Sequence, residues 1–381
     1  MNNRNVMIII QDLYRLGAQY VASLVAKGLS RRGYEVCVVV SDVHRQISVD
    51  RPELKPFGLP DEVDLIFLPH AKASRNVFEL KKLLKIKRPD VVMPMSPNYE
   101  MTCVLALCAM KKKNRPFLVP VVHSGGIGVD RKVSKVIHKE KLSSGVMQFL
   151  QSKVTDRAIA VSDGVFNSLV KTNMYFGRNI SVIHNPVIDE EFYEKKSEAT
   201  THPWLVNKDC PVIIAAGSHS PIKGYDVLIR AFSEVLKSVK CRLIMFGEGQ
   251  ETFNLKNLAH DIKVDQCVSF PGYTNTLPAE LKSADVFVVS SHCESFSIVI
   301  VEALACDVPV VATDCPTGPG ELLKGGRYGI LVRPNDPESL AKGLIEALNG
   351  KGIKPLSESW ETYTLDRVVG KYCSVLSELA R

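Results

Sequence analysis

The sequence predicts an α/β protein built from two doubly wound domains of similar size, each a parallel sheet covered by helices on both faces. Short apolar runs alternate with helical stretches along the chain, and this alternation breaks once and then starts again near residue 211. At 381 residues the chain is also longer than a single hydrophobic core usually supports. The break therefore indicates a boundary between two domains.

The first domain is predicted over residues 1–185. It opens with an apolar strand at 6–10, a loop containing Gly17 and a helix at 18–32. Strands that are apolar throughout are typical of parallel sheets, in which both faces are buried. The further strands predicted in this half lie at 35–40, 64–68, 90–95, 117–122, 157–161 and 180–184.

The second domain is predicted over residues 186–358, and a final helix within 359–381 is expected to return to the first domain. Residues 189–209 are charged and lack periodicity, which predicts a linker. The later strands are predicted at 211–216, 241–246, 267–270, 285–289, 308–312 and 328–332, and the helices at 224–237, 251–262, 297–306 and 336–348. Because such sheets bind ligands at the carboxyl ends of their strands, we expect a cleft between the two domains.

The net charge of +7 is unevenly distributed. Residues 1–185 contain 28 Lys and Arg against 15 Asp and Glu, a net +13, whereas residues 186–381 contain 20 against 26, a net −6. A basic half indicates an anionic partner surface. We expect peripheral docking on an anionic membrane through helices around 76–88, 109–115 and 131–153.

The cysteines and the apolar segments point to a cytoplasmic protein. The ten cysteines form no Cys-x-x-Cys pair and no zinc-like spacing, so reduced buried thiols are expected. The first apolar run, which ends at Gln11, is too short for a secretory signal. The localisation expected is therefore cytoplasmic, with peripheral attachment to the inner face of the cytoplasmic membrane.

Two glutamates eight residues apart, Glu294 and Glu302, form the most informative feature of the sequence. Glu302 stands alone in the apolar run 298–305, where an unpaired carboxylate must meet a partner or line a site. If a helix starts near Ser295, Glu302 lies two turns inside it and Glu294 just before it. The free amides at such a helix start can hold a diphosphate.

Two loops rich in small residues follow other predicted strands. The loop 216–224 contains Lys223, which can neutralise a phosphate of a leaving nucleotide. The loop 314–321 has Pro and Gly residues that open a short helix, which predicts another cradle for an anion or a hydroxyl. His123 also follows a strand, in the first half, where it can bond sugar hydroxyls or stabilise charge.

Together these residues resemble the retaining nucleotide-sugar glycosyltransferases of family four, which have the two-domain GT-B fold. The resemblance covers nearly the whole chain. It rests on the Gly17 loop, His123, the stretch 185–187, Lys223 with Gly224, and the pair Glu294 and Glu302 in its Glu-Ser-Phe-Ser setting. The last helix also resembles the one that crosses back to the first domain in that family.

The resemblance implies a role for each matching residue. Glu302 would hold the ribose hydroxyls, Glu294 would contact the donor sugar and Lys223 would bind the diphosphate. Catalysis would involve Glu294, His123 and Lys223. The remaining donor-binding residues implied are Gly17, Ser218, His219, Tyr273, Thr274, Ser295, Phe296, Ser297 and Ile298.

One position departs from the family pattern. The family usually has an arginine after the glycine that ends the strand predicted at 211–216, and here this residue is Ser218. Losing one of two cations at a diphosphate is expected to weaken binding by about 1–3 kcal/mol unless another base compensates. His219 is the candidate for that base.

The expected reaction moves a hexose or an N-acetylhexosamine from a nucleotide sugar to a glycan or lipid-linked acceptor, in bacterial cell-surface polysaccharide or lipopolysaccharide synthesis. UDP is favoured as the nucleotide and GDP comes second. The chain contains no Asp-x-Asp, so neither a metal nor another cofactor is expected. The leaving phosphate is expected to help deprotonate the acceptor on the same face of the sugar.

Three other classes of protein are alternatives to a glycosyltransferase. A GT-B epimerase or phosphorylase shares the fold, and a need for an added acceptor would separate a transferase from it. A dehydrogenase would need Gly-x-Gly-x-x-Gly after its opening strand, which the chain lacks. The basic half carries no nucleic-acid recognition motif, so no nucleic-acid partner is expected.

Overall fold

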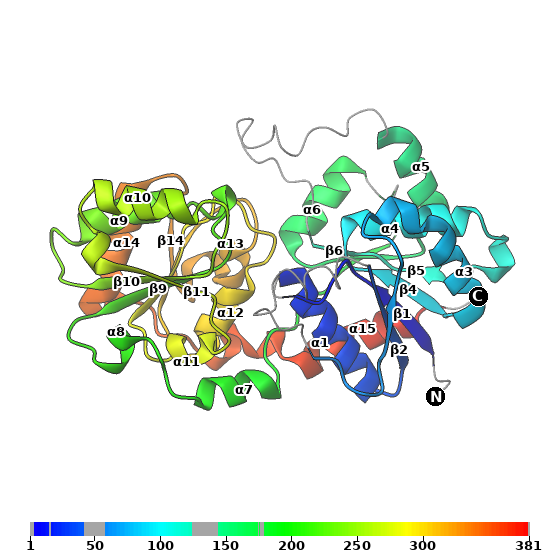
Figure 1. Cartoon of the computed structure of the whole chain (residues 1–381), viewed down its shortest axis with the longest axis horizontal. Helices are drawn as coiled ribbons and strands as arrows, with labels where there is room; N and C mark the ends of the chain where they lie inside the picture. Colours follow the sequence, from blue (N-terminus) through cyan, green and yellow to red (C-terminus); the bar gives the residue numbers. More distant parts are fainter. Residues whose placement is uncertain are drawn as a thin grey trace. The chain divides into compact units, whose positions relative to one another are not determined.

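The structure is a computed structural model, and it describes residues 4–14, 17–41, 58–123, 144–173, 175 and 179–379, without the side chains of 144–148 (Figure 1). The described chain divides into two compact units. The first consists of residues 4–186 together with 365–379, and the second of residues 187–364. Each unit is an α/β structure in which all the strand pairs are parallel.

The first unit contains a five-stranded sheet of order β3-β2-β1-β4-β5 and a three-stranded sheet of order β6-β7-β8. Its strands are β1 (Asn5–Ile9), β2 (Glu35–Val40), β3 (Asp64–Phe67), β4 (Val91–Pro94), β5 (Phe117–Leu118), β6 (Val121–Val122), β7 (Ala158–Ala160) and β8 (Ile180–Val182). Its helices are α1 (Gly17–Arg31), α3 (Val77–Lys87), α4 (Pro97–Cys108), α5 (Ser144–Val154), α6 (Asp163–Thr172) and α15 (Leu365–Ser377).

The single strand predicted at 117–122 is in fact two strands in different sheets. Before the junction, Val119 N donates to Val92 O at 2.9 Å, which continues the pairing with β4. After it, Ile159 N donates to Pro120 O at 2.9 Å and β6 pairs with β7. Pro120 has no amide hydrogen to extend the first ladder, so the chain changes partner there.

The second unit has one six-stranded sheet of order β11-β10-β9-β12-β13-β14. The first strand of this unit along the chain, β9, therefore lies in the middle of the sheet, and the winding reverses between β9 and β12. The strands are β9 (Val212–Ala216), β10 (Arg242–Phe246), β11 (Val268–Gly272), β12 (Val286–Val289), β13 (Val310–Thr313) and β14 (Ile330–Val332). The helices are α7 (Glu190–Ser197), α8 (Pro203–Val206), α9 (Tyr225–Val235), α10 (Thr252–Asp261), α11 (Leu277–Leu281), α12 (Ile298–Ala305), α13 (Pro319–Leu322) and α14 (Pro337–Glu346).

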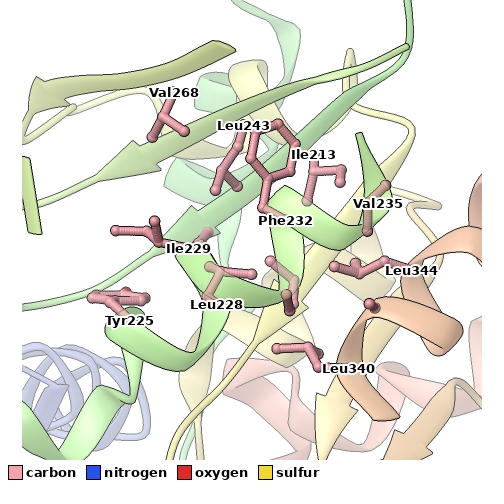
Figure 2. Close-up of a cluster of buried hydrophobic side chains, with 14 of the residues drawn as sticks. Ile213, Tyr225, Leu228, Ile229, Phe232, Val235, Leu243, Val268, Leu340 and Leu344 are labelled. Atoms are coloured by element: carbon pink, nitrogen blue, oxygen red, sulfur yellow. The ribbon is translucent and has the colours of Figure 1, made fainter. Parts of the chain in front are cut away.

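One face of this sheet is covered by α9, α10 and α14. Figure 2 shows Leu228, Phe232 and Val235 of α9 close to Ile213 of β9 and Leu243 of β10. Leu340 and Leu344 of α14 lie against the same cluster, and all of these side chains are buried. Since alternate strand residues point to opposite faces, Ile214, Ile244 and Phe287 are buried on the other side. Burial on both faces explains why the strands are apolar throughout.

The linker predicted over 189–209 is wrong in part, because it contains two helices. Asp189 caps α7 by accepting a hydrogen bond from Phe192 N at 3.1 Å. The chain that follows is fastened to α11 by Glu280, a fully buried carboxylate that accepts from Thr201 N at 2.9 Å and Thr201 Oγ1 at 2.7 Å. Glu280 and Thr201 are far apart in the sequence, so the local sequence pattern could not predict that this segment is ordered.

The last helix belongs to the first unit and packs on α1. A Cβ at Gly28 would lie 2.3 Å from Val369 Cγ2, so only glycine allows this approach. Arg32 pairs with Asp366 at the start of α15, and Arg157 pairs with Glu378 at 2.5 Å just beyond its end. The helix begins at Leu365; residues 357–359 and 361–363 before it are 3₁₀ turns.

Across the part of the chain that the structure describes, no helix combines the length and the apolar character that a membrane crossing requires.

Candidate active site

Three loops of the second unit meet at the carboxyl edge of its sheet, where β9, β12 and β13 end side by side. The loop after β9 and the loop after β12 are held together by close contacts with the backbone. Gly224 has a φ of +59°, and a Cβ there would lie 2.3 Å from Ser290 O, so glycine is required. Ser290 Oγ donates to Lys223 O at 2.8 Å, and His292 N donates to Ile222 O at 2.8 Å. The winding reverses here, and ligands of open α/β sheets bind at such points.

The loop after β13 supports the loop after β12 from its other side. Thr313 Oγ1 donates to Ser291 O at 2.6 Å, and Thr317 Oγ1 donates to Glu294 O. A Cβ on Gly318, whose φ is +86°, would lie 3.1 Å from both Glu294 Cβ and Phe296 O. The backbone around Glu294 is therefore held by hydroxyls and by close packing from two neighbouring loops.

Lys223 and Glu294 form an ion pair at the centre of these loops. Lys223 Nζ lies 2.6 Å from Glu294 Oε1, and the two side chains are 22% and 9% exposed. Ser291 Oγ donates to the same carboxylate oxygen at 2.7 Å. Oε2 accepts no hydrogen bond from the described residues, so it keeps its capacity to accept one from a ligand.

Helix α12 begins later than the sequence predicted. Its first residue is Ile298 and its N-cap residue is Ser297, which has a left-handed backbone and makes no capping hydrogen bond with its side chain. The amides of Ile298 and Val299 therefore have no intrahelical partner. Glu302 lies just over one turn into the helix, not two turns as expected. Of the four residues 295–298 that the resemblance implied as donor-binding, only Ile298 belongs to the helix.

Glu302 makes no side-chain hydrogen bond within the part of the chain that the structure describes. Burial raises the pKa of its carboxyl group from 4.5 to about 7, and the positive charge of Lys195 on α7 opposes part of that rise. A carboxylate without a partner in such a place is suited to accept hydroxyl groups from a ligand.

Replacing Glu302 with glutamine is expected to stabilise the protein at high pH. The folded-state pKa lies above the unfolded value, so the wild type loses stability as pH rises from about 4.5 to 7, and the full penalty stays above pH 7. The stability of Glu302→Gln relative to wild type should therefore improve by about 2 kcal/mol between pH 5 and pH 8. Denaturant unfolding at the two pH values measures this difference.

The same substitution should weaken the binding of UDP-glucose, because the amide replaces an ionised acceptor. UDP-glucose is a suitable probe since its diphosphate is esterified at both ends and does not titrate near neutrality. A matched control is Glu234→Gln, which changes a carboxylate that is 46% exposed on α9. An equal pH response in both variants would contradict the assignment of the raised pKa to Glu302.

His219 does not fit the role of a compensating cation. Its side chain is fully buried, between the rings of Tyr225 at 5.2 Å and Phe270 at 6.0 Å, and its Nδ1 lies 2.9 Å from Thr252 Oγ1. Burial, aided by Lys256, lowers its pKa to about 4. At neutral pH it carries no charge, against the expectation that it replaces the missing arginine. Ser218 itself lies 3.3 Å, Oγ to Oγ, from Ser220.

The remaining predicted residues lie in separate places. Tyr273 and Thr274 follow β11; Tyr273 is 41% exposed, and its hydroxyl donates to Glu248 O at 3.2 Å. Gly17 and His123 belong to the first unit, where they follow β1 and β6. Burial lowers the pKa of His123 to about 4, and its Nε2 is buried with no hydrogen-bond partner among the described residues.

Two residues of the site carried no predicted role. Ser291 orients one oxygen of Glu294, and Thr317 holds the backbone of the same residue. The sequence offered a weak signal for each, because Ser291 stands three residues before Glu294 and Thr317 lies in the loop rich in proline and glycine. Neither position alone distinguishes a hydroxyl that orients a carboxylate from one that caps a turn.

The chain was compared with known families, curated proteins and solved structures. The profile described as "Glycosyltransferase Family 4" matches residues 16–191, and the profile "Glycosyl transferases group 1" matches residues 197–367. Together they account for both units and all three loops of the site. The chain belongs to this glycosyltransferase family. It is therefore an enzyme of the GT-B fold, as the glutamate pair and the two-domain pattern predicted.

Relatives and solved structures match this glycosyltransferase over most of its length. An uncharacterized glycosyltransferase of Methanocaldococcus jannaschii is 26% identical over 92% of this chain and 91% of its own. An N-acetylgalactosaminyltransferase of Campylobacter jejuni, acting on an N-acetylgalactosamine-diacetylbacillosaminyl-diphospho-undecaprenol, is 26% identical over 91% of each chain. Among solved structures, HepE of Anabaena in complex with UDP and glucose has a TM-score of 0.75 at 18% identity and covers 99% of this chain and 100% of its own.

Proposed function

We propose that this glycosyltransferase moves a hexose or an N-acetylhexosamine from a UDP-sugar to a glycan or lipid-linked acceptor, with retention of the anomeric configuration. The observation that carries the proposal is the ion pair between Lys223 and Glu294 beside the uncapped start of α12. It places a cation, a carboxylate and free amides at one edge of one sheet. A nucleotide sugar needs all three, for its diphosphate and for its sugar hydroxyls.

The chemistry follows from the charge that develops on the leaving group. As the bond to the anomeric carbon breaks, electron density moves onto the diphosphate, and groups that bind this charge more tightly in the transition state lower the barrier. Lys223 and the amides of Ile298 and Val299 can supply that stabilisation. Glu294 holds Lys223 in place and keeps Oε2 for a sugar hydroxyl. The leaving phosphate then accepts the proton of the acceptor hydroxyl.

The choice of UDP is supported by a structural neighbour. HepE of Anabaena, which shares the fold, has been solved with UDP, with UDP and glucose, and with UDP-glucose. GDP remains the second choice. We assign Glu302 to the ribose hydroxyls, which UDP and GDP share.

The choice of a polysaccharide or lipid-linked acceptor is supported by relatives. The Campylobacter jejuni enzyme acts on a diphospho-undecaprenol carrier. A lipopolysaccharide core biosynthesis glycosyltransferase of Rhizobium meliloti, LpsE, is 35% identical over 38% of this chain and 42% of its own. Cell-surface polysaccharide or lipopolysaccharide synthesis is therefore the proposed setting.

A panel of UDP- and GDP-sugars tests this function. The purified protein is incubated with each sugar, with and without a lipid-linked acceptor, and free nucleotide is measured. We expect slow hydrolysis of one UDP-sugar, acceleration by acceptor, and no loss of rate on adding EDTA, since Lys223 and α12 supply the positive charge. Isomerisation of the sugar without an acceptor would favour the alternative of a GT-B epimerase, and a need for phosphate would favour a phosphorylase.

We also propose that the first unit docks on an anionic membrane through α3. Phe78 and Ile86 on this helix are large apolar side chains that are 79% and 67% exposed. Lys82 and Lys85 are exposed between them. The spacing 78, 82, 85 and 86 places these residues on one face of the helix. Apolar side chains flanked by lysines suit the boundary between lipid headgroups and acyl chains.

Two other predicted docking segments receive less support. Lys111, Lys112 and Lys113 are exposed around a 3₁₀ turn at 112–114, without a large exposed apolar side chain. Residues 131–143 lie outside the described residues. In α5, which follows them, Phe149 is 54% exposed and Lys153 lies 4.9 Å from its ring centroid.

Flotation with vesicles of anionic lipid tests the α3 surface. The wild type should float at low salt and partly sediment at high salt, because each lysine contributes about 1 kcal/mol near such a surface. The double variant Phe78→Ser/Ile86→Ser should lose flotation at both salt concentrations. Phe253→Ser is the matched control, since Phe253 is 73% exposed on α10 of the second unit. Wild-type protein that stays off anionic vesicles at every salt concentration would rule out the docking proposal.

A further inference from the structure

Ser297 combines two unfavourable features at the start of α12. Its backbone has φ 71° and ψ 76°, in the left-handed region that side chains disfavour. Its side chain is buried, at 8% exposure for the residue, and its Oγ has no hydrogen-bond partner among the described residues. Serine is among the best N-cap residues, yet this hydroxyl does not cap the helix.

Packing alone does not account for a serine at this position. A glycine would adopt the same backbone conformation without strain, and it would leave no buried hydroxyl unsatisfied. Strained residues of this kind persist where the surrounding structure holds them and cluster at ligand sites. The side chain therefore has a use that the ligand-free protein does not reveal.

The surroundings of Ser297 indicate what that use is. It stands three residues after Glu294 and five before Glu302, and it is followed by the two helix amides that lack an intrahelical partner. A helix start favours anions, and a hydroxyl there is a hydrogen-bond donor that needs an acceptor. We propose that Ser297 Oγ donates a hydrogen bond to a phosphate oxygen of the bound nucleotide sugar.

This assignment rests on the proposed function, and it adds a side-chain contact to the diphosphate beyond Lys223 and the amides. The hydrogen bond from Ser297 would also partly replace the contact that is lost where Ser218 stands in place of the family's arginine. The hydroxyl is neutral, so it restores a hydrogen bond and not a charge.

Two substitutions separate the hydroxyl from the backbone strain. Ser297→Ala removes the hydroxyl and keeps a side chain at positive φ, whereas Ser297→Gly removes both. We expect both variants to bind UDP about ten-fold more weakly than wild type in calorimetry. The Tm of Ser297→Gly should rise by about 2 °C more than that of Ser297→Ala, because both variants lose the unsatisfied hydroxyl but only glycine relieves the backbone strain. The affinity for uridine, measured by competition with UDP, should be unchanged in both variants.

Lys263→Gly is the matched control. Lys263 is exposed with φ 60°, and it lies before β11, at the opposite edge of the sheet. It should gain stability without a change in UDP binding. UDP affinity equal to wild type in Ser297→Gly and Ser297→Ala would overturn this inference and leave the proposed function intact. A wild type that binds neither UDP nor GDP would overturn the proposed function, and the inference with it.

Discussion

Replacing Lys223 with methionine is expected to lower kcat by about a hundred- to a thousand-fold. Among the described residues, Lys223 is the cation paired with Glu294 at the centre of the three loops, at 2.6 Å, and its side chain is only 22% exposed. A charge held in a partly buried site before the reaction starts stabilises a leaving group more than a solvated one does, and loss of one such donor costs about two to three orders of magnitude. The rate of UDP release from the accepted nucleotide sugar measures the effect.

Lys223→Met should also affect stability, and the experiment must separate this effect from the effect on kcat. Without Lys223, Glu294 would remain as a carboxylate that is 9% exposed and lacks its ion pair, so Lys223→Met should also lower Tm. The double variant Lys223→Met/Glu294→Gln removes the uncompensated charge and should recover Tm, while its kcat should fall below that of Glu294→Gln alone. A double variant with the same kcat as Glu294→Gln would show that Lys223 serves stability and not catalysis.

Lys237→Met provides the matched control for Lys223. Lys237 pairs with Glu234 at 2.7 Å, close to the 2.6 Å of the Lys223 pair, but its side chain is 68% exposed at the end of α9. Exposed pairs contribute about 0–1 kcal/mol, so this variant should keep both kcat and Tm. Lys223→Arg should retain part of the activity, because it keeps the charge in a larger and differently shaped group.

Glu294→Gln is the second substitution with a large expected effect, a fall in kcat of about a hundred-fold. The free oxygen Oε2 is the acceptor we assign to a sugar hydroxyl, and an amide that presents its NH₂ group there cannot accept. The glutamine also holds Lys223 less firmly, because a charge-assisted hydrogen bond becomes a neutral one. Steady-state rates at saturating donor report this loss directly.

UDP binding separates the role of Glu294 from that of Glu302. Lys223 is neutralised by Glu294 in the ligand-free protein, so Glu294→Gln should leave the affinity for UDP unchanged or increase it. Glu302→Gln should instead weaken binding of UDP and of UDP-sugars alike, since ribose is common to them. If Glu294→Gln weakened UDP binding as strongly as it lowered kcat, Glu294 would be a nucleotide ligand and our division of roles would fail.

The sequence singled out the candidate site residues that are consecutive or that follow a strand. Glu302 was identified because a single carboxylate stood within an apolar run, and Lys223 because it followed a strand in a loop of small residues. The same reasoning could not assign Ser291 or Thr317, because a hydroxyl gains its role only from the partner that folding brings to it. It also assigned a charge to His219, which burial between two rings removes.

The boundaries of helices and strands also divide into those that local sequence predicts and those that depend on distant residues. The strands of the three sheets were predicted to within one or two residues, since a strand that is buried on both faces has a continuous apolar sequence. Two exceptions required contacts between distant residues. The run at 117–122 was divided by Pro120, and the charged stretch 189–209 was ordered by Asp189 at the cap of α7 and by Glu280 of α11.

The sequence by itself determined that the chain has two α/β halves, and it singled out a glutamate pair as the candidate donor site, because apolar periodicity and an isolated carboxylate are local properties. Only the tertiary structure decided where α12 begins and which groups meet there. The left-handed turn at Ser297, the sharing of one Glu294 oxygen by Lys223 and Ser291, and the raised pKa of Glu302 all depend on packing between loops far apart in the chain. Charge and hydrogen bonding in a buried site are set by such neighbours, whereas the strands that carry the site are set by hydrophobic burial.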